Sequence, residues 1–213
     1  MGKIDQNKQI KRESLLETAY RFFTSKGIHK TSISDIVEAA GVAKGTFYLY
    51  FKDKYDIRNK LIAHKSSEVF KRADLALKAT GITEIEDRVV FLVDNIISQL
   101  VEDRTLLGFI SKNLGWGVFK NVLIEAGEDS DVDFYDIYNS MFRDEGKFDN
   151  PEVMVFMIIE LVGSACHSTI LHGEPVGIEE IRPYILRTVR GIMEMHRLGA
   201  RQDLILNLQK SIK

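Results

Sequence analysis

The side chains with the clearest chemistry in this sequence gather in one short run near position 45. The run offers an ammonium group, a hydroxyl, two phenols and two small residues: Ala43, Lys44, Gly45, Thr46, Tyr48 and Tyr50. Ammonium groups and phenols bind phosphate oxygens, lysine and hydroxyl groups reach base edges, and small residues allow close approach. These types suit contact with the major groove of DNA, provided that the fold presents them outward.

Helical periodicity upstream predicts two elements that would support this run. Apolar residues from Leu15 to Phe23 recur at spacings of three, four, seven and eight, which predicts a helix that ends at Gly27. Thr31-Ser32 then offers N-cap oxygens to a second, short helix. Gly41 follows that helix, and glycine adopts the positive φ of a tight turn at little cost.

A third helix is expected from about Ala43 to Phe51, with Phe47 and Phe51 one turn apart and directed inward. Three helices in this order match a helix-turn-helix, whose last helix enters the major groove. A helical packing unit that binds no nucleic acid shows the same spacing, so periodicity alone leaves both readings open.

A denser motif separates these two readings. Its parts, in order, are Phe22 to Gly27, Thr31-Ser32, Asp35-Ile36, Ala39 to Val42, and KGTFYLYFKDK from Lys44 to Lys54. This set resembles the N-terminal domain of the TetR/AcrR family of bacterial transcriptional regulators over about the first 55 residues. The resemblance implies that the six residues named first contact DNA, with Thr31 and Lys54 flanking them as phosphate contacts.

The 213-residue sequence as a whole predicts an all-α fold with two domains. With three prolines and no strand alternation, helices are expected at 61–79, 85–101, within 103–127, and at 132–142, 152–172 and 178–198. We expect a three-helix DNA-binding domain over residues 1–54 and a larger helical ligand-binding and dimerisation domain over residues 55–213.

Charge and composition favour the same division. Residues 1–60 hold 12 Lys and Arg against 7 Asp and Glu, whereas the remainder holds 17 against 24. A basic first quarter on an acidic remainder favours contact of that quarter with a polyanion. The single cysteine, Cys166, allows no internal disulfide, and the longest apolar run, Val153 to Ile159, is too short to cross a bilayer. We therefore expect a cytoplasmic protein that does not enter a membrane.

For the larger domain, the resemblance implies a small-molecule pocket and a dimer interface built from the last two long helices. The run from Val153 to Ile159 is apolar on all sides, so it needs more cover than one subunit provides. Glu160 within it is expected to be buried and to have a partner, most readily an arginine of the last helix. Candidate pocket residues are Leu106, Phe109, Ile110, Trp116, Phe119, Met141, Phe142, Cys166 and His167. Each of them also fits plain core packing.

No catalytic or metal-binding set is expected, and no cofactor. The chain has no G-x-S-x-G, P-loop or G-x-G-x-x-G motif. His167 and His172 are five apart, a spacing that does not place both on one face of an α-helix as four would. Cys166 beside His167 lacks any sign of an activated thiolate.

Together these features predict a homodimeric regulator that binds a palindromic operator and, as a repressor, is released by an unknown small molecule. Ligand binding would shift the connecting helix, over about residues 55–79, and change the separation of the two reading heads. Two alternatives stay open: a DNA-binding regulator without a ligand, and a helical small-molecule carrier without DNA binding.

Overall fold

The computed structural model describes residues 3–111 and 147–198, which form two compact units. The first unit, here called the head, comprises residues 1–65, and the second, the body, comprises residues 66–213. The sequence-based boundary at 54/55 coincides with the first residue of a long helix, whereas the boundary between compact units lies within that helix.

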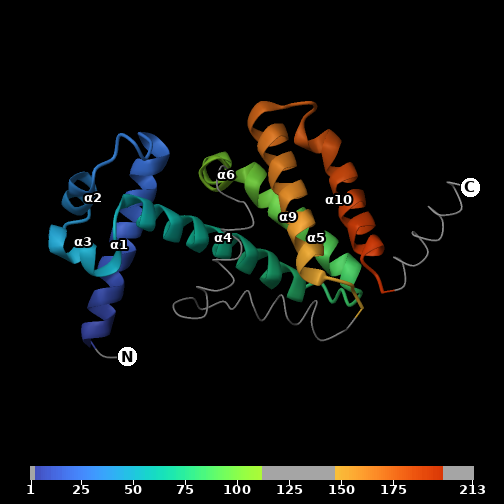
Figure 1. Ribbon diagram of the computed structural model, residues 1–213, viewed down its shortest axis with the longest axis horizontal. Coiled ribbons are helices and arrows are strands. Elements are labelled where there is room, and N and C mark those ends of the chain that lie inside the picture. Colours follow the sequence, from blue (N-terminus) through green and yellow to red (C-terminus); the bar gives the residue numbers. More distant parts are fainter. Residues whose placement is uncertain (1–2, 112–146, 199–213) are drawn as a thin grey trace, which may run out of the picture. The chain divides into compact units, whose positions relative to one another are not determined.

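Three helices open the head: α1 (Lys3–Ser25), α2 (Ile33–Ala39) and α3 (Lys44–Tyr50) (Figure 1). Ser32 begins α2 through a capping box, in which its hydroxyl accepts from the amide of Asp35 and the Asp35 carboxylate accepts from the amide of Ser32. Gly41 has φ +67° in the turn between α2 and α3, as the sequence predicted. These local signals produce the expected helix-turn-helix.

Helix α4 (Lys54–Lys78) begins in the head and ends in the body. The Asp53 carboxylate accepts hydrogen bonds from the amides of Tyr55 and Asp56, which is why the helix starts several residues before the apolar stripe that predicted it. Ile57, Leu61 and Ile62 are fully buried in the head. The first turns of α4 are therefore part of the head's core.

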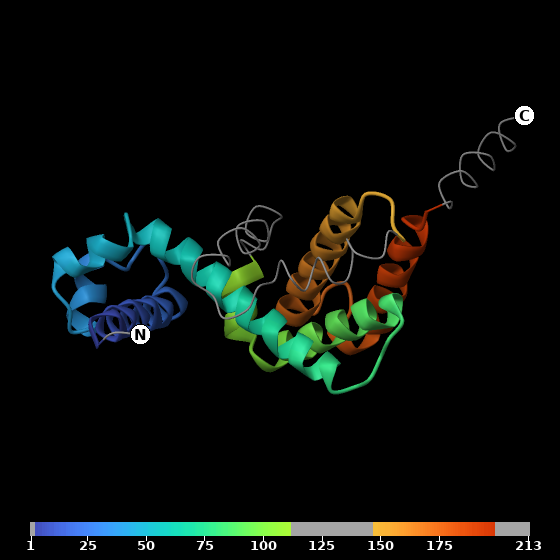
Figure 2. The same ribbon diagram turned by 90° about the horizontal axis from the view of Figure 1, so that it is seen from below.

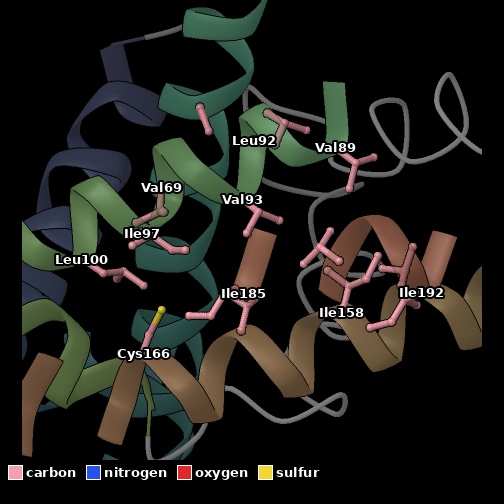
Figure 3. Packing of buried hydrophobic residues seen from close by; sticks show 14 of the residues in the cluster. Val69, Val89, Leu92, Val93, Ile97, Leu100, Ile158, Cys166, Ile185 and Ile192 are labelled. Carbon is pink, nitrogen blue, oxygen red and sulfur yellow. The ribbon is translucent and has the colours of Figure 1, made fainter. Parts of the chain in front are cut away.

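The body continues with α5 (Ile85–Glu102), α6 (Arg104–Ser111), α9 (Pro151–Cys166), the π-helix η2 (His167–His172) and α10 (Ile178–Met195). Its core joins the second half of α4 to these helices. Figure 3 shows Val69 of α4, Ile97 of α5, Cys166 of α9 and Ile185 of α10 among the buried side chains of this core. The described residues contain no strand, apart from an isolated bridge between Phe148 and Arg197, so the all-α expectation is confirmed.

Helices α9 and α10 lie side by side in both ribbon views (Figures 1 and 2). By length and composition, the segment Pro151–His172 is long and apolar enough to cross a membrane, although the uninterrupted apolar run within it, Val153 to Ile159, is too short to do so. Core helices of water-soluble proteins can be equally long and apolar. One face of α9 is in fact buried through Met154, Ile158 and Val162. The expected helix at 132–142, and the part of 103–127 that follows residue 111, lie outside the described residues.

Candidate nucleic-acid interface

Two phenylalanines anchor α3 to the head. Phe47 and Phe51 are 0% and 1% exposed, and their ring centroids lie 5.5 Å apart. They stand four residues apart, so they hold one side of the helix against the core. The opposite side of α3 must face solvent.

The solvent side of α3 carries most of the DNA-contact candidates. Ala43, which caps the helix, is exposed, as are Lys44, Gly45 and Tyr48. Thr46 and Tyr50 are partly buried, and the ring of Tyr50 packs near that of Phe51 at 6.2 Å. One short helix thus presents an ammonium group, a hydroxyl and two phenols. Whether they touch DNA stays a prediction.

The two flanking candidates have a different setting. The side chain of Thr31 is 1% exposed, and its hydroxyl donates to the carbonyl of Gly27 at 2.9 Å. The Lys54 ammonium donates to the carbonyls of Ile28 at 3.0 Å and Thr31 at 3.3 Å. Both side chains are therefore engaged within the head itself. Their expected role as phosphate contacts stays a prediction.

Leu49 is a candidate that the sequence analysis missed. Its side chain is 78% exposed on α3, between Tyr48 and Tyr50. The signal lay in the helical register, because Leu49 is two residues from each buried phenylalanine and hence on the far side of the helix. An exposed leucine beside polar contact residues suits apolar contact with a thymine methyl group.

The negative charge of the Asp35 carboxylate, near the start of α2, is partly balanced by neighbouring donors. The amide of Ser32 and the ammonium of Lys26 both donate to the carboxylate of Asp35, and they lower its pKa from 3.8 to about 2. Lys26 lies 3.0 Å from this carboxylate and also over the ring of Phe22. The Asp35 charge is therefore fixed to the head and stabilises the capping box.

The candidate pocket residues in the body fall into two groups. Leu106 and Ile110 on α6 are buried, as is Cys166, whereas Phe109 and His167 are partly exposed. Since α6 packs against η2, the structure brings these two segments together. Burial raises the pKa of Cys166 to about 12, so its thiol stays protonated. The other candidates, Trp116, Phe119, Met141 and Phe142, lie outside the described residues.

The expectation that His167 and His172 occupy different faces is wrong. Residues His167–His172 form a π-helix, whose i to i+5 pairing brings residues five apart back to one side. The two ring centroids are 5.3 Å apart. Among the described residues, no group of three or more His, Cys, Asp or Glu side chains could hold a metal ion.

A polar groove of about 470 Å³ lies elsewhere in the body, between the start of α5 and the end of α10. Its lining comprises Glu84, Glu86, Asp87, Arg190, Glu194 and Arg197. Ion pairs join Arg190 to Asp87 and Arg197 to Glu86 across it, so these charges tie the two helices together. None of the predicted pocket residues lines this groove.

The sequence model described as bacterial regulatory proteins of the tetR family matches residues 15–61, which span α2, α3 and their supports from α1 and α4. Residues 15–61 of this chain thus belong to the TetR family of N-terminal domains. The resemblance seen in the sequence is thereby confirmed.

Two curated relatives of this chain come from Bacillus subtilis (strain 168). The uncharacterized HTH-type transcriptional regulator YdgC is 34% identical over 102 residues, which is 46% of this chain and 52% of the relative. The fatty acid metabolism regulator protein is 31% identical over 103 residues, which is 47% of this chain and 51% of the relative. The chain thus spans about half the length of the curated relatives it matches.

A solved structure extends the likeness to the body. The transcriptional regulator FadR from Bacillus subtilis, solved in complex with stearoyl-CoA, matches with a TM-score of 0.60 and 18% identity. The match covers 83% of this chain and 96% of that one. At this identity the likeness shows a shared fold, a helix-turn-helix head followed by a helical body.

Proposed function

We propose that this TetR-family protein is a DNA-binding transcriptional regulator that acts as a homodimer and is released from its operator by a small-molecule ligand. The proposal rests on one observation: the outer side of α3 exposes polar side chains that can contact DNA. Buried Phe47 and Phe51 turn the helix so that Lys44 and Tyr48 are exposed, the latter by 53%. Ala43, Gly45, Thr46 and Tyr50 complete the proposed DNA contacts, and Leu49 joins them.

The decisive experiment is a salt titration of DNA binding. Duplexes selected from a random pool by the purified protein supply the operator, which should be palindromic because a twofold dimer reads two related half-sites. If a dimer neutralises about eight phosphates, the slope of log K against log salt is about −7. A flat slope, or no selected duplex, would favour the helical carrier instead.

Lys44 offers the sharpest single variant for this experiment. Lys44→Ala should weaken operator binding and make the salt slope shallower, because an exposed ammonium group that faces phosphate is lost. Lys71→Ala is the matched control, an exposed lysine of α4 within the body. Equal losses for both variants would remove Lys44 from the interface.

The outer faces of the last two long helices support the dimer. Val153, Phe156 and Met157 are exposed on α9, at spacings that share one face, and Tyr184 and Met195 are exposed on α10. A second copy of this chain would cover such apolar side chains. Glu160, expected to be buried, is exposed on the same face of α9, where it would flank the apolar residues.

Sedimentation of a charged variant tests the dimer. Met157→Glu should shift the particle from two chains to one, because a carboxylate would be buried in the interface. Leu75→Glu is the control, because Leu75 is 56% exposed and belongs to α4 of the body, not to α9 or α10. A Met157→Glu particle that keeps the mass of two chains would place the interface elsewhere.

The ligand proposal rests on the apolar side chains of α6 and η2, which pack together in the body. Stearoyl-CoA is the first probe to test, because the solved FadR fold holds it and a curated relative regulates fatty acid metabolism. Stearoyl-CoA should release the operator duplex while coenzyme A alone should not. Failure to bind this probe and other amphiphiles would favour the ligand-independent regulator.

We further propose that the protein acts in the cytoplasm and has no catalytic activity.

A further inference from the structure

The ammonium group of Lys54 is held by main-chain oxygens of the head. It donates to the carbonyls of Ile28 and Thr31, at 3.0 and 3.3 Å. Both carbonyls belong to residues 26–32, here called the α1–α2 loop, because α1 ends at Ser25 and α2 begins at Ile33. Lys54 is the first residue of α4. Its side chain thus joins the start of α4 to the loop that leads into α2.

Thr31 closes the same loop from within. Its hydroxyl donates to the carbonyl of Gly27 at 2.9 Å, and its amide donates to the carbonyl of Ile28 at 3.3 Å. Gly27 has φ +82°, so the chain turns sharply where the hydroxyl binds. With a side chain that is 1% exposed, Thr31 can reach a phosphate only if the loop opens.

This loop controls where α2 starts. Ser32, the next residue, is the N-cap of α2, and α2 packs directly against α3. A shift of the α1–α2 loop therefore changes the placement of α2 and, through it, the angle at which α3 meets a groove.

We propose that Lys54 and Thr31 are positioning residues for DNA recognition, which hold the α1–α2 loop against the start of α4 and so orient α2 and α3. This inference rests on the proposed DNA-binding function and replaces the role of phosphate contact that the family resemblance implied. The two roles differ in charge. A lysine on phosphate releases a counterion, whereas a lysine on carbonyls within the protein contributes no such release on binding.

Salt titration of Lys54→Met in the full-length chain separates the two roles. Methionine keeps an unbranched apolar stem but cannot donate. We expect affinity for the selected duplex to fall by about tenfold, the scale of one lost specific contact. The salt slope and the affinity for a shuffled duplex should stay at the wild-type values, because no phosphate contact is lost. A role limited to stability would leave the ratio of these two affinities unchanged in folded protein.

Hydrogen exchange of the protein without DNA gives a second readout. Amides of the α1–α2 loop should exchange faster in Lys54→Met than in wild type, because two carbonyls lose their anchor. Lys52→Met is the matched control: it removes an exposed lysine two residues away and should leave both exchange and the affinity ratio unchanged. Thr31→Val, which keeps the shape of the buried side chain, should reproduce the Lys54→Met pattern.

Two results would overturn the inference. One is a salt slope that becomes shallower by about 1.8 for the dimer, or 0.9 for each subunit, with loop exchange unchanged, which would make Lys54 a phosphate contact. The other is wild-type behaviour of both variants in all measurements. If the wild-type protein selects no duplex, the proposed function fails, while exchange in the α1–α2 loop still shows whether Lys54 holds it.

Discussion

The head and the body differ in how far apart in the sequence their cooperating residues stand. In the head, the seven residues of α3 contain both a buried anchor, Phe47, and the exposed contact candidates. In the body, the pocket candidates Leu106 and His167 stand about sixty residues apart in the sequence, on α6 and η2, which pack together. A local pattern can therefore specify the site of the head, whereas the site of the body depends on long-range packing.

The largest expected effect tests how much the head depends on one side chain. Phe47→Ala removes a fully buried ring and should cost about 3–5 kcal/mol of unfolding free energy. A unit of about 65 residues has little stability to lose, so the head should unfold while the body stays folded. Thermal melting followed by circular dichroism should show an early transition that is absent from wild type.

Alkylation of Cys166 reports whether the body stays folded in Phe47→Ala, and Met154→Ala provides the control. Cys166 is fully buried and its pKa is raised to about 12, so alkylation at pH 8 should stay slow when only the head unfolds. Met154→Ala, a fully buried change within the body, should instead speed that labelling by lowering the body's own stability. Fast labelling of Cys166 in Phe47→Ala would mean that the two units unfold together.

A smaller effect separates a glycine needed for the fold from one proposed to meet DNA. Gly41→Ala places a side chain at φ +67° and should lower stability by about 1–2 kcal/mol. Gly45 lies within α3 without positive φ, so Gly45→Ala should raise stability by up to about 1 kcal/mol. Operator affinity should nevertheless fall for Gly45→Ala, because a methyl group would crowd the groove. Urea melts and gel shifts of both variants check these opposite effects.

Sequence reasoning was strongest where the physics is local. Ser32, Gly41 and the paired phenylalanines predicted α2, the turn and α3 because capping, positive φ and helical spacing each depend on a few neighbouring residues. It failed for His167 and His172 because a π-helix inserts one extra residue in a turn, which composition does not reveal. It also placed Glu160 inside, since an all-apolar stretch does not say which face another subunit would cover.

The smallest expected effect is on pH dependence. Asp35 has a pKa of about 2 in the folded head against 3.8 for the free side chain, so ionised Asp35 favours folding. This contribution is complete above about pH 4 and is lost as pH falls towards 2. Asp35→Asn should remove the part of the head's acid sensitivity that lies in this range. Identical acid melts for wild type and Asp35→Asn would show that the capping box carries no charge-dependent stability.

The position of the unit boundary within α4 has a practical consequence for chimeric regulators. Lys60 donates to the carbonyl of Tyr50 at 3.4 Å, and the ammonium of Lys65 lies 5.3 Å from the ring centroid of Tyr20, so the first three turns of α4 contact α1 and the end of α3. A fusion that transplants this head onto another sensor should be joined after residue 65. If α3 reads the operator as proposed, a junction at residue 54 would combine α3 of one protein with the α4 lysines of another and should change operator choice even with α3 intact.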